Sequence, residues 1–176
     1  KRAKLKSLRR EVSIVLQEPY LFQGTLRYNL KFGRPETTED EMLRVAKLVG
    51  IDEPIMRLPK GYDEEVREHG SNLSYGQRQL VCLARAIIAD PKILILDEAT
   101  SSVDPYTEQL IQDALKAEMK NRTVIIVTHR VSTVRDADRI IVLFNGEVQA
   151  EGTHTQLVMQ NELYRRLCEM QLVQAV

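Results

Sequence analysis

The 176-residue sequence lacks a charge excess, a long apolar run and a cysteine cluster. Its 25 basic and 25 acidic residues give a formal net charge of +0, so it has none of the basic excess that binds nucleic acid or an anionic membrane non-specifically. A membrane span needs roughly 20 consecutive apolar residues, whereas the strongest apolar runs, 93–96 and 124–127, are short. The sequence therefore argues against a nucleic-acid partner and predicts no membrane span in these residues.

The two cysteines, Cys82 and Cys168, are far apart and belong to no Cys-x-x-Cys or Cys/His pattern. This argues for free thiols in a reducing compartment such as the cytosol, and against a disulfide framework or a zinc site. Hydrophobic residues make up 43% and charged residues 28%, which is typical of a globular chain. Because the sequence begins with Lys1 instead of Met, we expect it to be processed or cut from something longer.

Strand-like and helix-like segments alternate along the chain. Thr38 and Glu41 form a T-x-x-E capping box that opens an amphipathic helix, and Gly50 closes it. Four β-branched runs are typical of parallel strands that are buried on both faces, namely 12–16, 93–96, 123–127 and 140–143. Further helices are predicted at about 74–90, 105–120, 153–158 and 162–173.

The order of these elements predicts an α/β sheet that is interrupted by a helical insertion at about 35–91. A segment rich in turn and charged residues, 59–72, is expected to be a loop before the second helix. The Asn145-Gly146 pair predicts a hairpin between 140–143 and 147–150. In such sheets, ligands bind at the carboxyl ends of the strands.

Two adjacent acids, Asp97 and Glu98, follow the apolar run at 93–96. Carboxylates at the end of a buried strand repel one another and lose hydration unless a cation, a proton or a water network is supplied. In a Walker-B-type interpretation, Asp97 holds Mg²⁺, usually through its water shell, and Glu98 polarises the water that attacks a γ-phosphate. In the structural alternative, Asp97 caps the following turn and Glu98 is a solvated neighbour.

The segment at 72–79 opens the second predicted helix. Ser74 and Gln77 stand at capping-box spacing, so a well-capped helix explains them. Gly76 supports a second interpretation, because a glycine lets backbone N–H groups approach an anion closely at the positive end of a helix. From the residues alone, the cap is favoured and a phosphate site stays open.

Linked motifs cover nearly the whole chain in a fixed order. They are Gln17 with Glu-Pro-Tyr-Leu-Phe and Gly-Thr after it, 65–70, Leu-Ser-Tyr-Gly-Gln at 73–77, 93–104 and His129. Together they resemble the nucleotide-binding domain of exporter-type ABC transporters, with its Q-loop, X-loop, signature motif, Walker B strand followed by the D-loop at 101–104, and a histidine. The resemblance implies a P-loop NTPase-like, mostly parallel sheet that binds ATP and Mg²⁺.

The resemblance also implies roles for single residues. Gln17 would reach the metal and the attacking water, and its loop would sense the transmembrane part. His129 would contact the γ-phosphate, and Glu98 would be the catalytic acid-base residue, with Asp97 and Gln17 at the metal. The nucleotide-binding positions would be Ser74, Gly76, Gln77 and Asp104, the last at the interface between two such domains. Without the resemblance, a lone histidine is more often structural, and Gln17 would be a solvated loop residue.

Three departures from the family pattern stand out. No Gly-x-x-x-x-Gly-Lys-Ser/Thr segment is present, so we expect the N-terminal part of the core to be missing and the chain alone to bind ATP poorly and be inactive. Tyr75 replaces the first glycine of the signature, which matters little if that position points away from phosphate. Arg67 replaces a glycine of the X-loop, which could alter contact with the membrane domain.

The expected organisation is a RecA-like core at 1–34 and 92–150, a helical subdomain with the signature at 35–91, and C-terminal helices at 151–176. The expected function is ATP hydrolysis that powers export, at the cytoplasmic face of a membrane. Its partners would be a second nucleotide-binding domain and, through the Q-loop and X-loop, transmembrane domains. Two alternatives are a half-site module that supplies its signature in trans without hydrolysis, and a soluble ABC-type ATPase of DNA repair or translation.

Overall fold

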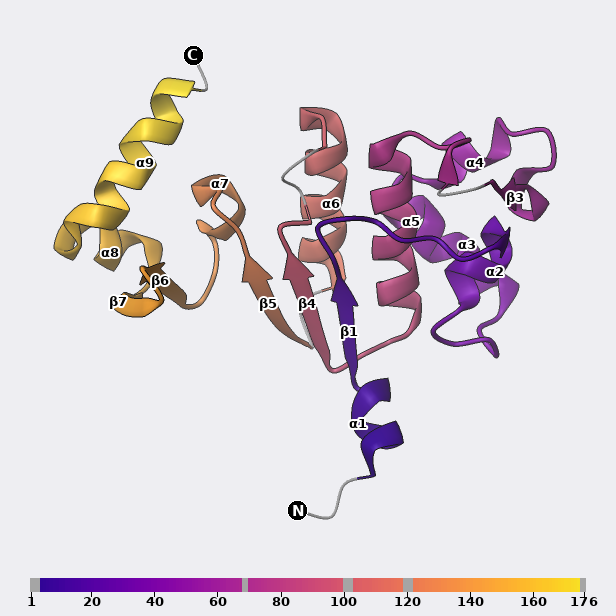
Figure 1. Cartoon of the computed structure of the whole chain (residues 1–176), viewed down its shortest axis with the longest axis horizontal. Helices are drawn as coiled ribbons and strands as arrows, with labels where there is room; N and C mark the ends of the chain where they lie inside the picture. The colour runs from indigo at the N-terminus through magenta and orange to yellow at the C-terminus, as the bar shows by residue number, and fades with distance from the viewer. Residues whose placement is uncertain (1–3, 68–69, 100–102, 119–121, 175–176) are drawn as a thin grey trace. The chain divides into compact units, whose positions relative to one another are not determined.

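The computed structural model describes residues 4–67, 70–99, 103–118 and 122–174, and it confirms a mixed α/β fold (Figure 1). The chain forms two compact units, Lys1–Val127 and Thr128–Val176. This division follows contacts within the chain, and the expected subdomain boundaries at 34, 91 and 150 stay a prediction. No helix in the described part of the chain is long and apolar enough to cross a membrane.

A three-stranded parallel sheet forms the centre of the first unit (Figure 1). Its strands are β1 (Val12–Val15), β4 (Ile93–Asp97) and β5 (Thr123–Val127), in the order β1-β4-β5. The register aligns Ile14 with Ile95 and Ile95 with Ile125. Three of the four predicted parallel strands are therefore confirmed, and their carboxyl ends meet at one edge of the sheet.

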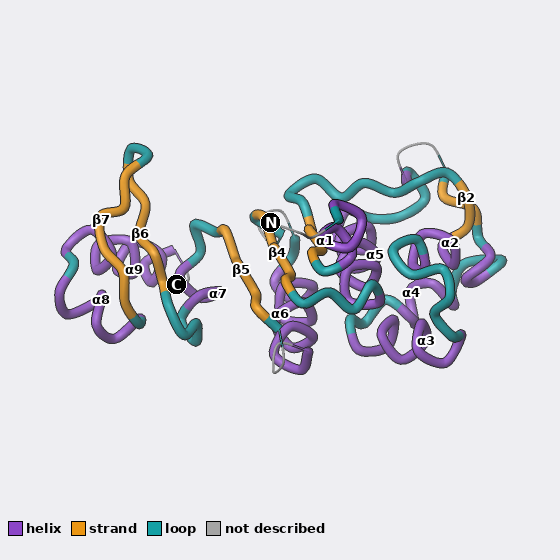
Figure 2. Tube along the Cα trace, turned by 90° about the horizontal axis from the view of Figure 1, so that it is seen from below, coloured by secondary structure: helices purple, strands orange, loops and turns teal. Residues whose placement is uncertain are grey.

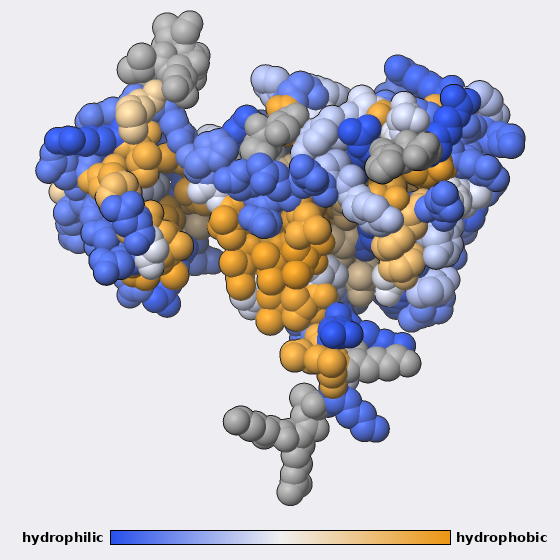
Figure 3. All heavy atoms as spheres, in the orientation of Figure 1, coloured by the Kyte–Doolittle hydropathy of each residue, from blue (hydrophilic) through white to orange (hydrophobic). Residues whose placement is uncertain are grey.

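The two faces of this sheet differ in burial. Val15 and Leu96 are buried on the face covered by α5 (Tyr75–Ile88) and α6 (Pro105–Glu118). On the other face, Ile14 is 55% exposed and Ile125 47% exposed, and Figure 3 shows an apolar surface there. The prediction of burial on both faces is wrong for the described residues, because they place helices on one face only.

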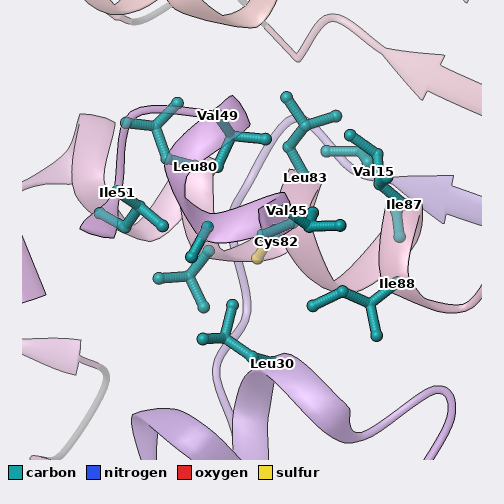
Figure 4. Packing of buried hydrophobic residues seen from close by; sticks show 14 of the residues in the cluster. Val15, Leu30, Val45, Val49, Ile51, Leu80, Cys82, Leu83, Ile87 and Ile88 are labelled. Atoms are coloured by element: carbon teal, nitrogen blue, oxygen red, sulfur yellow. The ribbon is translucent and has the colours of Figure 1, made fainter. Parts of the chain in front are cut away.

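Helix α5 is the central element of the larger core (Figure 4). Its apolar side chains, among them Leu80, Leu83 and Ile87, are buried against α2 (Leu26–Lys31), α3 (Glu39–Leu48) and β1, and α4 (Asp52–Met56) packs against α3. Before the sheet lies a short helix, α1 (Leu5–Arg10). The predicted helices that begin at Ser74 and Pro105 are confirmed, with α6 ending at Glu118 among the described residues.

The cap of α3 forms only in part. The Thr38 hydroxyl accepts a hydrogen bond from the Glu41 amide at 3.2 Å, as predicted. The Glu41 carboxylate accepts instead from the Arg44 guanidinium at 2.9 and 3.0 Å, so the reciprocal half of the predicted capping box is not described. An arginine one turn later competes successfully for the same carboxylate, and it lowers the pKa of Glu41 through this hydrogen bond.

The predicted loop at 59–72 contains regular structure. It holds a 3₁₀ turn, Gly61–Asp63, and the strand β3 (Glu65–Val66), which pairs antiparallel with β2 (Gly24–Thr25). Strands of two residues carry no periodicity that a sequence could show. Their pairing fastens the segment after Gln17 to the segment before the signature.

Over its described residues, 128–174, the second unit contains a hairpin and three helices. Strands β6 (Ile140–Phe144) and β7 (Glu147–Gly152) pair antiparallel through a turn at Asn145 (φ 51°) and Gly146 (φ 80°), as the sequence predicted (Figure 2). The prediction that 140–143 joins the parallel sheet is wrong, since β6 pairs with β7 in a separate two-stranded sheet. The helices are α7 (Val131–Val134), α8 (His154–Gln160) and α9 (Glu162–Gln174).

Candidate functional site

Gln17 and Glu98 meet at the carboxyl edge of the parallel sheet. Gln17 follows β1 and Glu98 follows β4, and the Gln17 Nε2 donates a hydrogen bond to the Glu98 Oε2 at 3.0 Å. Strands β1 and β4 are parallel neighbours, which explains why residues 81 positions apart come together. These two candidate residues therefore lie together at the edge where ligands of such sheets bind.

Glu98 has an unusual backbone conformation. Its φ is 45°, in the left-handed region that residues other than glycine and Asn/Asp rarely adopt. The other described non-glycine residues with positive φ are Asp90 and Asn145, whose short side chains tolerate this region. The Glu98 amide donates to the Val127 carbonyl at 2.8 Å, which holds the turn against β5. Such strain persists only where surrounding structure enforces it, and it is common at functional sites.

Asp97 is the last residue of β4 and its side chain is exposed. Its carboxylate and the Gln17 carboxamide offer oxygen donors, which Mg²⁺ prefers. Among the described residues, no group of three or more His, Cys, Asp or Glu side chains could enclose a metal ion. The donor set therefore suits a magnesium ion that takes its other ligands from water and phosphate, as this metal usually does.

Ser74 caps α5 with a complete capping box. The Ser74 Oγ accepts from the Gln77 amide at 3.2 Å, and the Gln77 Oε1 accepts from the Ser74 amide at 2.9 Å. The structural interpretation of this motif is therefore confirmed. The capping box does not use the hydrogen of the Ser74 hydroxyl, because a hydroxyl oxygen that accepts from an amide can still donate its own proton. The cap and a phosphate contact are compatible.

Gly76 packs against Asp104 and the first turn of α6. A Cβ at this position would lie 3.1 Å from the Thr107 Oγ1 and 3.6 Å from the Asp104 Oδ2. Asp104 itself accepts from the Thr107 amide at 3.0 Å and from the Thr107 hydroxyl at 2.6 Å. These donors hold the pKa of Asp104 below its usual value. Gly76 and Asp104, both predicted at the nucleotide, thus lie side by side.

The segment after β1 is fastened to α5 by side chains that sequence reasoning missed. Tyr75, Gln79, Cys82 and Arg85 each donate a hydrogen bond to a backbone carbonyl between Leu16 and Tyr20. Their spacing along α5 places them on one face of the helix. That spacing was the available signal, although the identity of the carbonyls could not be read from it.

His129 belongs to the second unit, directly after β5. Its side chain is exposed, and its backbone carbonyl accepts a hydrogen bond from Gln171 of α9. The Gln171 Oε1 also accepts from the Val131 amide at 2.7 Å. A single glutamine therefore holds the chain on both sides of Arg130.

Parts of two predicted motifs lie outside the described residues, namely 68–69 of the X-loop and 101–102 of the D-loop. The described first part of the X-loop, 65–67, is held by Asn72, which donates to the Glu65 carbonyl at 3.0 Å and accepts from the Arg67 amide at 3.1 Å. The side chain of Arg67 is exposed.

An aromatic patch, Tyr20, Phe22, Tyr28 and Phe32, covers the surface near β2 and α2. The rings of Phe22 and Phe32 are stacked with centroids 3.9 Å apart, and Tyr20 meets Phe22 edge-on at 5.2 Å. The Arg85 guanidinium lies 5.1 Å from the centroid of Phe22. Tyr20 is 64% exposed and Tyr28 49% exposed, although large apolar surfaces are usually buried. The patch is suited to binding another protein surface.

Comparisons with known proteins agree on one family. The sequence profile described as ABC transporter matches residues 1–101. An uncharacterized ABC transporter ATP-binding protein of Bacillus subtilis is 50% identical over 172 residues, which are 98% of this chain and 28% of that protein. A fatty acid ABC transporter ATP-binding/permease protein of Mycobacterium bovis is 43% identical over 161 residues, which are 92% of this chain and 26% of that protein.

Among solved structures, a bacterial Atm1-family ABC exporter with ATP bound matches with a TM-score of 0.87 and 40% sequence identity. The match covers 94% of this chain and 29% of the exporter chain. The chain thus spans less than a third of the length of the proteins that it resembles.

Proposed function

This chain belongs to the ABC transporter family, and we propose that it is part of a nucleotide-binding domain whose ATP hydrolysis powers export across a membrane. The observation that carries the proposal is the contact between Gln17 and Glu98 beside Asp97, at the carboxyl edge of the parallel sheet. Ligands of open α/β sheets bind at this edge.

Glu98 is the residue that acts on water in this proposal. Its carboxylate orients a water molecule toward the γ-phosphate and accepts its proton, and the strained backbone at φ 45° fixes where that carboxylate points. The Gln17 Nε2 donates to the Glu98 Oε2 at 3.0 Å, which restrains the orientation of the carboxylate. His129 contacts the γ-phosphate. A bound Mg²⁺, held by Asp97 and Gln17, would neutralise charge that develops on the phosphate oxygens.

The phosphate-wrapping loop is not among these 176 residues. Its backbone amides and lysine normally supply most contacts to the β- and γ-phosphates. The half-exposed row of Ile14, Ile95 and Ile125 supports the idea that further residues of the same domain belong here, since such an apolar sheet face is usually covered. We place those residues on this face and assign the missing loop to them.

The signature residues act on a second nucleotide in this proposal. Ser74 donates its hydroxyl proton and the start of α5 offers its free amides to the γ-phosphate of ATP held by an opposing domain. Gln77 keeps the cap in place, Gly76 lets the backbone approach, and Asp104 lies beside it at the same interface. Two such domains would enclose two ATP molecules.

Transmembrane domains are the second partner that we propose. The exposed rings of the aromatic patch support the proposal that the segment after Gln17 docks on a transmembrane domain. The exposed Arg67 of the X-loop directly follows β3, and β3 pairs with β2 in that segment. We therefore propose that the chain lies at the cytoplasmic face of a membrane.

Steady-state ATP hydrolysis by the full-length protein tests the proposal. Glu98→Gln keeps the shape of the side chain but cannot accept a proton, and general-base contributions are typically ~10²–10⁴-fold. We therefore expect phosphate release to fall by about two orders of magnitude or more. Glu36→Gln is the matched control, because Glu36 is exposed and distant in sequence from every motif. If Glu98→Gln and Glu36→Gln released phosphate at equal rates, Glu98 would not be the base.

The complete capping box that Ser74 and Gln77 form at the start of α5 supports a second candidate. This is a half-site module that completes a partner's ATP site without hydrolysing nucleotide itself. A single-turnover assay with a P-loop-bearing partner separates the two candidates. If this chain is only a half-site module, its Glu98→Gln variant should support the partner's ATP hydrolysis as well as the wild-type chain does.

A further inference from the structure

A stripe of hydrogen-bond donors on α5 faces the backbone after β1. The Tyr75 hydroxyl donates to the Gln17 carbonyl at 2.5 Å, and the Gln79 Nε2 donates to the Leu16 carbonyl at 3.3 Å. One to two turns further on, Cys82 and Arg85 donate to the Tyr20 carbonyl at 3.5 and 3.0 Å. The stripe therefore fixes the loop before and after Gln17 as well as at Gln17 itself.

The loop is held even without Tyr75. Gln79 is 0% exposed, and among the described residues its Oε1 has no hydrogen-bond partner. A buried oxygen without a partner destabilises a fold. The contribution of Gln79 to the structure is therefore the hydrogen bond that its carboxamide Nε2 donates to the Leu16 carbonyl. Arg85 makes a second anchor at Tyr20. Attachment of the loop does not depend on the phenol at 75.

Tyr75 differs from the other donors in what its acceptor does. The carbonyl that it binds belongs to Gln17, and the side chain of the same Gln17 donates to Glu98 at 3.0 Å. The three residues form one hydrogen-bonded chain from the first helical residue of α5 to the carboxylate at the sheet edge. The ring is half-buried and lies 5.6 Å from the Arg78 guanidinium, which restrains its orientation.

We propose that Tyr75 is a positioning residue that sets the orientation of Gln17 and, through it, of the Glu98 carboxylate. The proposal rests on the function proposed for Glu98. Ser74, the residue before Tyr75, is the one that we place at the opposing nucleotide. When Ser74 binds that nucleotide, a shift of the start of α5 moves the Tyr75 hydroxyl. The shift then reaches Glu98 through the two hydrogen bonds of Gln17.

Removal of the hydroxyl alone tests this role. In the full-length protein, Tyr75→Phe keeps the ring and its contact with Arg78, and it should lower kcat for ATP by about tenfold, because small displacements of a catalytic group are costly. The KM for ATP should stay within about twofold of wild type, since the hydroxyl contacts no nucleotide in its own site.

Tyr62→Phe is the matched control. The Tyr62 hydroxyl also makes a 2.5 Å hydrogen bond, to Asp52, and the residue is 6% exposed within the helical region. We expect Tyr62→Phe to lower Tm and leave kcat unchanged, whereas Tyr75→Phe should lower kcat with little change in Tm. A kcat for Tyr75→Phe within about threefold of wild type would overturn the proposal.

A double-mutant cycle with Gln17→Ala shows whether Tyr75 acts through Gln17. If it does, Tyr75→Phe should change the single-turnover rate by less than about threefold in the Gln17→Ala background, because the link is already broken. An equal loss in both backgrounds would also overturn the proposal. Glu98→Gln distinguishes this outcome from failure of the proposed function: if Glu98→Gln still abolishes hydrolysis, only the role of Tyr75 is wrong.

Discussion

Ser74→Ala separates stability from catalysis at the start of α5. The substitution removes the acceptor of the 3.2 Å bond from the Gln77 amide and leaves the 2.9 Å bond from the Ser74 amide to Gln77. Because Ser74 is exposed, water replaces the lost partner, and the cost should be about 1 kcal/mol, within the usual range for a cap. For a domain of this size, that lowers Tm by about 2–4 °C.

Thr153→Ala is a close control. Thr153 caps α8 with the same reciprocal box, in which the Gln156 amide donates to the hydroxyl at 3.4 Å and the Gln156 side chain accepts from the Thr153 amide at 2.9 Å. The two substitutions should therefore have similar effects on Tm. Only Ser74→Ala should reduce hydrolysis per folded molecule, because we propose a phosphate contact for the Ser74 hydroxyl and none for the Thr153 hydroxyl.

The assay uses mixed dimers in which one domain carries Ser74→Ala and single-site hydrolysis is followed. We expect loss of turnover at the site that faces the substituted signature and normal turnover at the other. Equal turnover at both sites, with the Tm shift of a lost cap, would refute the phosphate role and leave the Ser74 box as a structural feature alone.

Two further predictions follow from the described contacts. The isolated 176-residue chain should bind ATP weakly, because it contains no phosphate-wrapping loop and we propose only secondary contacts for Gln17, Asp97 and His129. Micromolar affinity in calorimetry would contradict this. Thr107→Val should destabilise the domain near neutral pH, where the Asp104 carboxylate is ionised and bound. Since the pKa of Asp104 is lowered in the fold, its contribution is present above the ordinary aspartate value of about 3.9 and is lost as the pH falls through the folded value. The urea-unfolding midpoints of wild type and Thr107→Val should therefore converge below about pH 4. A difference between the midpoints that stays constant with pH would contradict a role for the ionised Asp104 carboxylate.

Sequence patterns predicted elements well where the local signal is strong. The start of α5 at Ser74, the start of α6 at Pro105 and the hairpin at Asn145-Gly146 each depend on capping or turn chemistry that acts within a few residues. The two acids at 97–98 were found because an apolar strand that ends in carboxylates is unusual. The contact between Glu98 and Gln17 follows from the parallel pairing of β1 with β4.

Sequence patterns did not predict the features that depend on contacts with residues outside the local segment. The strand at 140–143 has the composition of the central strands, but its neighbour is the hairpin partner β7. Glu41 has the right spacing for a capping box and binds Arg44 instead. The sequence predicts that Tyr75 matters little if its position points away from phosphate. Its contact with the Gln17 carbonyl depends on how α5 packs beside β1, which no local pattern encodes. The backbone strain at Glu98 likewise depends on Val127.

The nucleotide retained by Glu98→Gln tests the central claim most directly. The purified full-length variant would be incubated with Mg-ATP, separated from free nucleotide, and its bound nucleotide identified by chromatography. If Glu98 activates the attacking water, the variant should retain ATP while wild type yields ADP. Bound ADP in Glu98→Gln, formed at the wild-type rate, would contradict the account.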